Sequence, residues 1–270
     1  MKKASAVRAL RIILERCKPD LVFLSETHLK KEEAESLKRK FHFDNVEVFE
    51  SDGRAGRLLM MWKNCLNVTS SRVHSNYIDL RFDENSVSGW RFTGFYGEPS
   101  GERKHLSWDY LCDLKQMCDL PWLIGGDFNE ILFASEKEGG NIRPQRCMQA
   151  FRDAMDDCNV EDLGYRGDIF TWRRGRIRER LDRVLGYIFW RDTASDLWTP
   201  VIFSYIVYNR FNSFSSSFAR WSYFILIIFT STYLILCVQQ AGEIAKLSVS
   251  LGQSICNYVQ VHVNCRKRCR

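Results

Sequence analysis

Three short apolar segments, widely separated along the chain, each carry an acidic residue at or near one end. Residues 21–24 lead into Glu26, residues 122–126 lead into Asp127, and a third apolar segment contains Asp182. Apolar runs of this length, bounded by turn-forming residues, are typical of buried strands. A sheet made of such strands must be covered on its apolar faces, so the chain is expected to fold in layers.

Helical and strand-like segments alternate over the first 200 residues, and this alternation favours the mixed α/β class. The expected strands are residues 21–24, 46–49, 56–62, 68–73, 90–96 and 122–126, with the arms of a hairpin at 170–172 and 177–185. The expected helices are residues 7–14, 31–40, 104–118 and 146–158. We therefore predict an α/β sandwich of two mixed sheets.

The composition changes near residue 200. The chain has 39 basic and 33 acidic residues, and seven of the basic residues but only one acid lie in residues 201–270. The net charge of +6 therefore belongs to this tail, and it gives no support for nucleic-acid binding by the rest of the chain. We predict one domain at residues 1–200 and a divergent apolar and basic tail at residues 201–270.

Within the tail, residues 221–238 form an uncharged stretch of eighteen residues, which is long enough for a short transmembrane helix. Basic residues on both sides leave its orientation open. The stretch could instead be a buried helix, or out-of-frame or intron-derived sequence without an evolved role. We expect a nuclear or cytoplasmic protein if the tail is soluble, and a membrane protein if the stretch inserts. The sequence does not indicate an oligomeric state.

The ten cysteines and the N-terminal segment add two negative findings. The cysteines include no CxxC pair and no zinc-ligand spacing, which is typical of reduced thiols in an intracellular protein. The first twenty residues lack the apolar core of a secretory signal.

The three acidic segments predict phosphodiester hydrolysis with a hard cation. Mg²⁺ prefers carboxylate oxygens and keeps several waters, so one or two acids at strand ends are enough to bind it. Period-two alternation would place Asp127 and Asn129 on one face, although Gly, Asp and Asn are also turn formers. Taken singly, Glu26 could be a loop charge and Asp182 could pair with a neighbouring arginine. Their order and wide spacing together favour a shared site.

Three ordered motifs, Glu26-Thr27, Gly126-Asp127-Phe128-Asn129 and Arg180-Leu181-Asp182-Arg183, resemble those of the endonuclease/exonuclease/phosphatase superfamily. Over residues 4–190 the chain looks most similar to the endonuclease domain of plant non-LTR (LINE-type) retrotransposons. The further motifs that carry this resemblance are residues 19–27, 92–97, 136–140 and 170–172.

The resemblance implies a four-layer α/β/β/α sandwich, truncated at both ends, with the site at one edge. It also implies that Glu26 binds Mg²⁺ and that Asp127 orients or deprotonates the attacking water. Asn129 would hold a phosphate oxygen, and Tyr96 would touch the scissile phosphate. Asp182 would support a catalytic histidine.

The same resemblance places Phe170, Trp172 and Arg176 on a hairpin near the DNA. Without it, the two aromatic residues would be read as part of the core. Arg176 belongs to a group of hairpin arginines that also includes Arg173, Arg174 and Arg178. Such a group could contact phosphates, but a solvated hairpin face explains it equally well.

Two family elements are not found in the sequence. The chain begins downstream of an asparagine-bearing first strand, and the region expected to hold Ser-Asp-His reads Asn-Ser-Phe-Ser at residues 212–215. We therefore expect a Mg²⁺-dependent phosphodiester hydrolase of the DNA endonuclease type by ancestry, inactive or severely impaired. The alternatives are a membrane-anchored binding protein without catalysis and an active phosphodiesterase on a membrane phospholipid.

Overall fold

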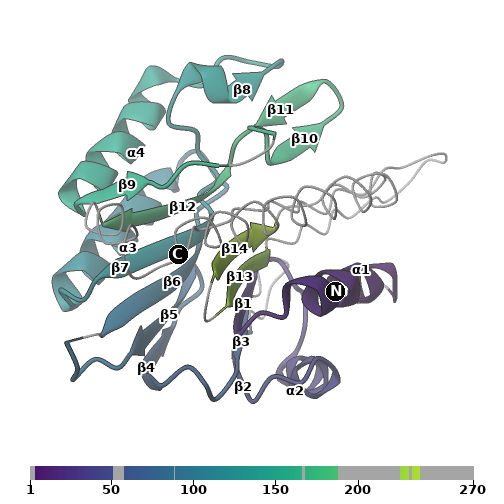
Figure 1. Cartoon of the computed structure of the whole chain (residues 1–270). Coiled ribbons are helices and arrows are strands. Elements are labelled where there is room, and N and C mark those ends of the chain that lie inside the picture. The colour runs from purple at the N-terminus through teal and green to yellow at the C-terminus, as the bar shows by residue number, and fades with distance from the viewer. Residues whose placement is uncertain are drawn as a thin grey trace, which may run out of the picture.

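Two β-sheets lie face to face, and a pair of helices covers the outer face of each (Figure 1). The computed structural model describes residues 4–50, 58–87, 89–165, 168–187, 226–230 and 233–237. The four-layer α/β/β/α sandwich expected from the sequence is confirmed.

The first sheet is antiparallel throughout. Its strand order is β14 (Tyr233–Cys237), β13 (Leu226–Thr230), β1 (Leu21–Leu24), β3 (Leu58–Trp62) and β2 (Asn45–Phe49). Helices α1 (Ala4–Cys17) and α2 (Lys31–Lys40) pack on its outer face through apolar side chains that include Leu10, Leu14 and Leu37.

The second sheet carries most of the site. Its strand order is β4 (Val68–Val73), β5 (Tyr77–Phe82), β6 (Trp90–Tyr96), β7 (Trp122–Asp127), β12 (Asp182–Tyr187) and β9 (Val160–Asp162). Strands β6 and β7 are parallel, and the other pairs are antiparallel. Helices α3 (Lys104–Met117) and α4 (Gln145–Asp157) cover the outer face.

A small third sheet projects beside the site. It contains β10 (Trp172–Arg174), β11 (Ile177–Glu179) and the two-residue strand β8 (Lys137–Glu138), which follows the short 3-10 helix η1 (Ala134–Glu136). Figure 1 shows this sheet at the same end of the sandwich as the start of β12.

Apolar side chains from both large sheets fill the space between them. Phe23 and Met60 from the first sheet meet Phe92, Leu123 and Val184 from the second, and all five are buried. Because these strands contribute side chains to an apolar layer on each face, they read in the sequence as continuous hydrophobic runs rather than alternating ones. This packing fixes the two sheets relative to each other and so aligns their strand ends.

Most of the expected elements occur with small shifts at their ends. Strands β5, β8 and β9 were not expected, although the sequence YIDLRF of β5 alternates apolar and charged residues. The expected second hairpin arm at residues 177–185 is wrong as a single strand. It divides at Arg180 and Leu181 into β11, which pairs with β10, and β12, which pairs with β7.

The possible transmembrane helix at residues 221–238 is not seen in the described part of that segment, which forms β13 and β14. Branched and aromatic residues such as Ile227, Ile228 and Phe229 suit a strand, and an apolar run of this length does not distinguish a strand from a helix. Among the residues that the structure describes, no helix combines the length and apolar character needed to cross a membrane.

Candidate active site

Three neighbouring strands of the second sheet bring Tyr96, Asp127 and Asp182 side by side. In the parallel pair of β6 and β7, Tyr96 lies opposite Asp127. In the antiparallel pair of β7 and β12, Asp127 lies opposite Asp182. Residues that are directly opposite on adjacent strands have neighbouring Cβ atoms, so the sheet itself places an aromatic hydroxyl and two carboxyl groups in one row.

Glu26 joins this row from the other sheet. It follows β1 after a single residue, and the hydroxyl of Tyr96 donates a hydrogen bond to its carboxylate Oε1. Glu26 adopts a left-handed backbone conformation with φ of 52°. Non-glycine residues rarely occupy this region, and such strained positions concentrate at functional sites. We call Glu26, Asp127 and Asp182 the acidic cluster.

Asn129 reaches the site through a turn rather than by strand alternation. Strand β7 ends at Asp127, and the Asn129 backbone N–H donates a hydrogen bond of 2.7 Å to Asp127 Oδ1. The Asn129 side-chain amide Nδ2 donates to the Gly97 carbonyl at 2.8 Å, and Asn129 has a φ of 53°. Asp127 and Asn129 lie close together, as expected, but a turn brings them together and not the alternation of a strand.

Glycine at position 97 makes the close approach of this turn possible. A Cβ atom there would lie 2.2 Å from the backbone oxygen of Phe128, which is far inside van der Waals contact. The Gly97 N–H also donates to the Asp127 carbonyl at 2.7 Å. The end of β6 is thereby held directly against the turn that follows β7.

The acidic cluster is electrostatically unfavourable as it stands. Burial, and then the charge of Asp182, raise the pKa of Asp127 well above its usual value, although the Asn129 N–H opposes the rise. Burial also raises the pKa of Asp182 to about 7, against the effects of Thr171 and Arg183. Asp182 and Tyr96 are buried, whereas Glu26, Asp127 and Asn129 keep part of their surface exposed. A substrate could therefore reach the exposed three.

The donor set suits a hard divalent cation. Carboxylates that raise one another's pKa would be stabilised as anions by a cation beside Glu26. Within the described residues, no group of three or more His, Cys, Asp or Glu side chains is arranged as a metal site. Mg²⁺ does not require one, because it keeps waters and takes oxygens from phosphate.

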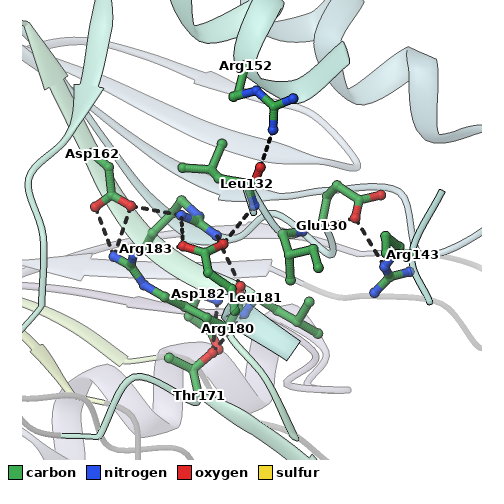
Figure 2. A network of polar contacts seen from close by, with 12 residues as sticks. Glu130, Leu132, Arg143, Arg152, Asp162, Thr171, Arg180, Leu181, Asp182 and Arg183 are labelled. Atoms are coloured by element: carbon green, nitrogen blue, oxygen red, sulfur yellow. Dashed lines mark hydrogen bonds and ion pairs between the residues drawn. The ribbon is translucent and has the colours of Figure 1, made fainter. Parts of the chain in front are cut away.

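Three residues have supporting roles that the sequence analysis did not predict. Asn76 donates to the Tyr96 carbonyl at 3.0 Å and accepts from the Tyr96 N–H at 2.7 Å. Thr171 Oγ1 accepts the Asp182 N–H at 3.0 Å, a contact drawn in Figure 2. Lys104 donates to the Asn129 carbonyl. Thr171 belongs to the 170–172 motif, but no local pattern indicates these contacts, because each joins residues at least 11 positions apart.

The hairpin residues lie beside the acidic cluster rather than within it. Phe170 packs under the guanidinium of Arg178, whose Cζ is 4.5 Å from the ring centroid. Trp172 is half-buried against the small core of Ile131 and neighbouring side chains, and Arg176 is exposed in the turn between β10 and β11. Residues 209–215 and His262 lie outside the described residues.

A two-sheet α/β sandwich with carboxyl groups meeting at the ends of its inner strands is an arrangement typical of phosphoester hydrolases. The chain belongs to the Endonuclease/Exonuclease/phosphatase family, whose model matches residues 2–215. This match confirms the superfamily to which the three ordered motifs pointed.

Solved structures of the same fold include nucleic-acid enzymes. The 3' phosphatase NExo from Neisseria, bound to product DNA hairpin, is 14% identical with a TM-score of 0.54, over 69% of this chain and 83% of its own. An AP endonuclease from Archaeoglobus fulgidus is 14% identical with a TM-score of 0.56, over 67% and 81%.

The endonuclease domain of TRAS1, a telomere-specific non-LTR retrotransposon, is 16% identical over 70% of this chain and 83% of its own, with a TM-score of 0.49. At these identities the likeness is one of fold. No curated protein is significantly similar to the chain in sequence.

Proposed function

We propose that the chain is a Mg²⁺-dependent phosphodiester hydrolase of the DNA endonuclease type whose turnover is strongly reduced. The observation that carries this proposal is the meeting of Glu26, Asp127 and Asp182, from two different sheets, at one partly exposed edge. Membership of the family supports phosphoester hydrolysis, and the DNA-processing enzymes among the solved structures support DNA as the substrate.

Each residue of the site has a role that follows from its environment. Glu26 would hold Mg²⁺, which stabilises negative charge on the phosphorus oxygens when bound. Asp127 is partly exposed and fixed by the Asn129 N–H, so it can orient a water and accept its proton. Asn129 uses one side-chain N–H on Gly97, which leaves the second for a phosphate oxygen.

Tyr96 serves as a neutral hydrogen-bond donor. Burial, followed by the charges of Glu26 and Asp127, raises its pKa above the usual value, so the hydroxyl stays protonated. It directs that proton to Glu26 and can turn it toward the scissile phosphate.

The reduced turnover follows from the sequence. No histidine lies between Asp182 and His262, so the chain has no Ser-Asp-His motif at the expected distance. Loss of one preorganised donor to a developing charge commonly costs a factor of roughly 10²–10³ in rate. Asp182, in turn, has no imidazole from this motif to support.

The β10–β11 hairpin supplies the surface for DNA in this proposal. Arg176 is exposed at its tip, and Phe170 and Trp172 lie at its base. Arginines interleaved with aromatic rings can contact phosphates and stack on bases.

Nicking of supercoiled plasmid by the purified protein in Mg²⁺ tests the proposal. We expect slow conversion to the open circle, no conversion in EDTA, and none with the Asp127→Ala variant. Nicking that survives this substitution would come from a contaminant. Prolonged incubation at high protein concentration without any nicking would refute the proposed activity.

A further inference from the structure

A line of alternating charges runs from the Asn129 turn to the β10–β11 hairpin. Lys104 lies 3.7 Å from Glu130, measured between Nζ and Oε2, and Glu130 lies 3.2 Å from Arg143, measured between Oε1 and Nε. Arg143 then contacts Glu179 of β11 at 3.1 Å, between its terminal nitrogen and Oε2, and Glu179 pairs with Lys137 of β8. We call these five residues the charge line.

The charge line begins at the candidate active site. Glu130 immediately follows Asn129, and Lys104 contacts both the Asn129 carbonyl and the Glu130 carboxylate. The Glu130 side chain is 1% exposed, so its charge depends on these cations. Displacing either cation would displace the turn that carries Asn129.

The charge line ends in the β10–β11 hairpin, which supplies the proposed DNA surface. Glu179 lies directly opposite Trp172 across the β10–β11 pair, and its side chain is only 8% exposed. Its two cationic partners, Arg143 and Lys137, come from a loop and from β8. The position of the hairpin is therefore tied to the loop that holds Arg143.

Arg143 is the one member of the charge line that contacts both buried acids. It pairs with Glu130 and with Glu179, and the first of these contacts is drawn in Figure 2. A planar guanidinium can contact two carboxylates at once, whereas the compact ammonium of lysine acts as a single point charge. Loss of Arg143 would remove the contact that links Glu130, next to the Asn129 turn, with Glu179 in the hairpin.

We propose that Arg143 is a positioning residue that couples the β10–β11 hairpin to the Asn129 turn, so that contacts made by the hairpin are transmitted to the catalytic side chains. The catalytic consequence rests on the proposed function, but the mechanical coupling does not. In the part of the chain that the structure describes, Arg143 pairs with Glu130 and Glu179 and forms no ion pair with the acidic cluster.

Amide hydrogen exchange in the full chain measures the coupling without requiring activity. Glu179→Gln weakens the hairpin end of the line, and we expect exchange at residues 128–132 to rise roughly fivefold or more, as for directly coupled charged side chains. Glu138→Gln is the matched control, because Glu138 pairs with Arg178 on the exposed face of the same small sheet. We expect it to leave residues 128–132 within about twofold of the wild type. Faster exchange confined to β11 in the Glu179→Gln variant would overturn the coupling.

Arg143→Lys provides a second variant in case Glu179→Gln destabilises the whole fold, which faster exchange at residues 58–62 would reveal. It keeps a cation beside both acids but should not contact both of them, so we expect faster exchange at residues 128–132. Exchange equal to the wild type would show that the shared contact is not needed. In the nicking assay, Arg143→Lys should lower kcat by a larger factor than it raises KM, since Asn129 acts at the reacting phosphate while the hairpin keeps its own arginines and aromatic rings for DNA. A wild type that does not nick would refute the proposed function only, because the exchange experiment decides the coupling independently.

Discussion

Two groups of acidic residues lie at neighbouring positions in the molecule and have opposite electrostatic character. In the acidic cluster, carboxyl groups face one another, and burial raises the pKa of Asp182 to about 7. In the second group, Asp162 is paired with Arg180 and Arg183, as Figure 2 shows. Glu136 is paired with the same two arginines. We call these four residues the ion network.

The contrast is sharpest along a single strand, because Asp182 and Arg183 are adjacent in β12 and belong to different groups. Burial alone would raise the pKa of Glu136, but the charge and hydrogen bonds of Arg183 lower it overall. The acids of the ion network are therefore stabilised as anions by the two arginines. In the acidic cluster, the pKa values of Asp127 and Asp182 stay raised despite the opposing contacts, which is the property expected of a site that acts on a ligand.

The largest expected effect comes from breaking the ion network. The Arg183 side chain is fully buried and pairs with both Glu136 and Asp162. Arg183→Met would therefore remove one cationic partner from each of these acids. Removing one partner from a buried ion pair costs about 3–5 kcal/mol. Urea unfolding should show this loss, and a stability equal to that of the wild type would mean that the network contributes little to the fold.

Asp127→Asn tests the acidic cluster and should lower the nicking rate without lowering the stability of the fold. The change keeps the shape of the side chain and removes a charge that burial disfavours, so we expect no loss of stability in urea. The nicking rate should fall by roughly 10²–10³. Glu136→Gln, which makes the same type of change in the ion network, is the control, and it should destabilise the fold. Equal effects of the two substitutions on stability would erase the distinction between the groups.

Thr171→Val affects the point where the hairpin meets the acidic cluster. It removes the acceptor of the Leu181 and Asp182 backbone N–H groups, both at 3.0 Å, in a buried setting. Each unsatisfied buried group costs about 1–3 kcal/mol, so the two groups together should cost about 2–3 kcal/mol, near the lower end of their summed range, after relaxation. Thr171→Ser keeps the hydroxyl and should retain nearly all of the stability in the same urea measurement.

The smallest expected effect is a pH dependence of stability. Because the pKa of Asp182 is raised in the folded state, that state binds more protons than the unfolded chain between the ordinary pKa near 4 and about 7. Stability should therefore fall as the pH rises through this window. We expect a melting temperature in EDTA that is a few degrees lower at about pH 8 than at about pH 5.

Asp182→Asn should reduce this difference, and Mg²⁺ at the higher pH should recover part of it, because a ligand that binds the folded state stabilises that state. A melting temperature that rises between the two pH values in EDTA, and is unchanged by Asp182→Asn, would contradict the assigned pKa direction.

The contrast also explains how much of the structure could be predicted from the sequence. The layered fold and the acids of the cluster follow from strand-like runs that end in acidic residues, which is local information. The division of residues 177–185 at Arg180 and Leu181 was missed, because no Gly or Pro interrupts this segment to indicate that its two halves pair with different strands. β5 was missed because Asp79 is buried against Arg91, a pairing that only the tertiary structure reveals.

The positioning residues could not be predicted from the sequence for the same reason. Lys104 lies in a helix of unremarkable pattern, and its contact with the Asn129 carbonyl spans 25 positions of the chain. Glu130 was indistinguishable from a loop charge. The site could be located from motifs, but the residues that hold it in place could be found only from contacts.

The pairing of β13 with β1 has a consequence for how the chain is made. Leu21 pairs with Phe229, so one edge of the first sheet is completed only after some 200 further residues have been translated. At roughly 5–20 residues per second, the ribosome needs about 10–40 s to deliver β13. Over that interval the edge of Leu21–Leu24 in the nascent chain lacks this partner strand, and chaperone binding to that edge is the expected safeguard against aggregation.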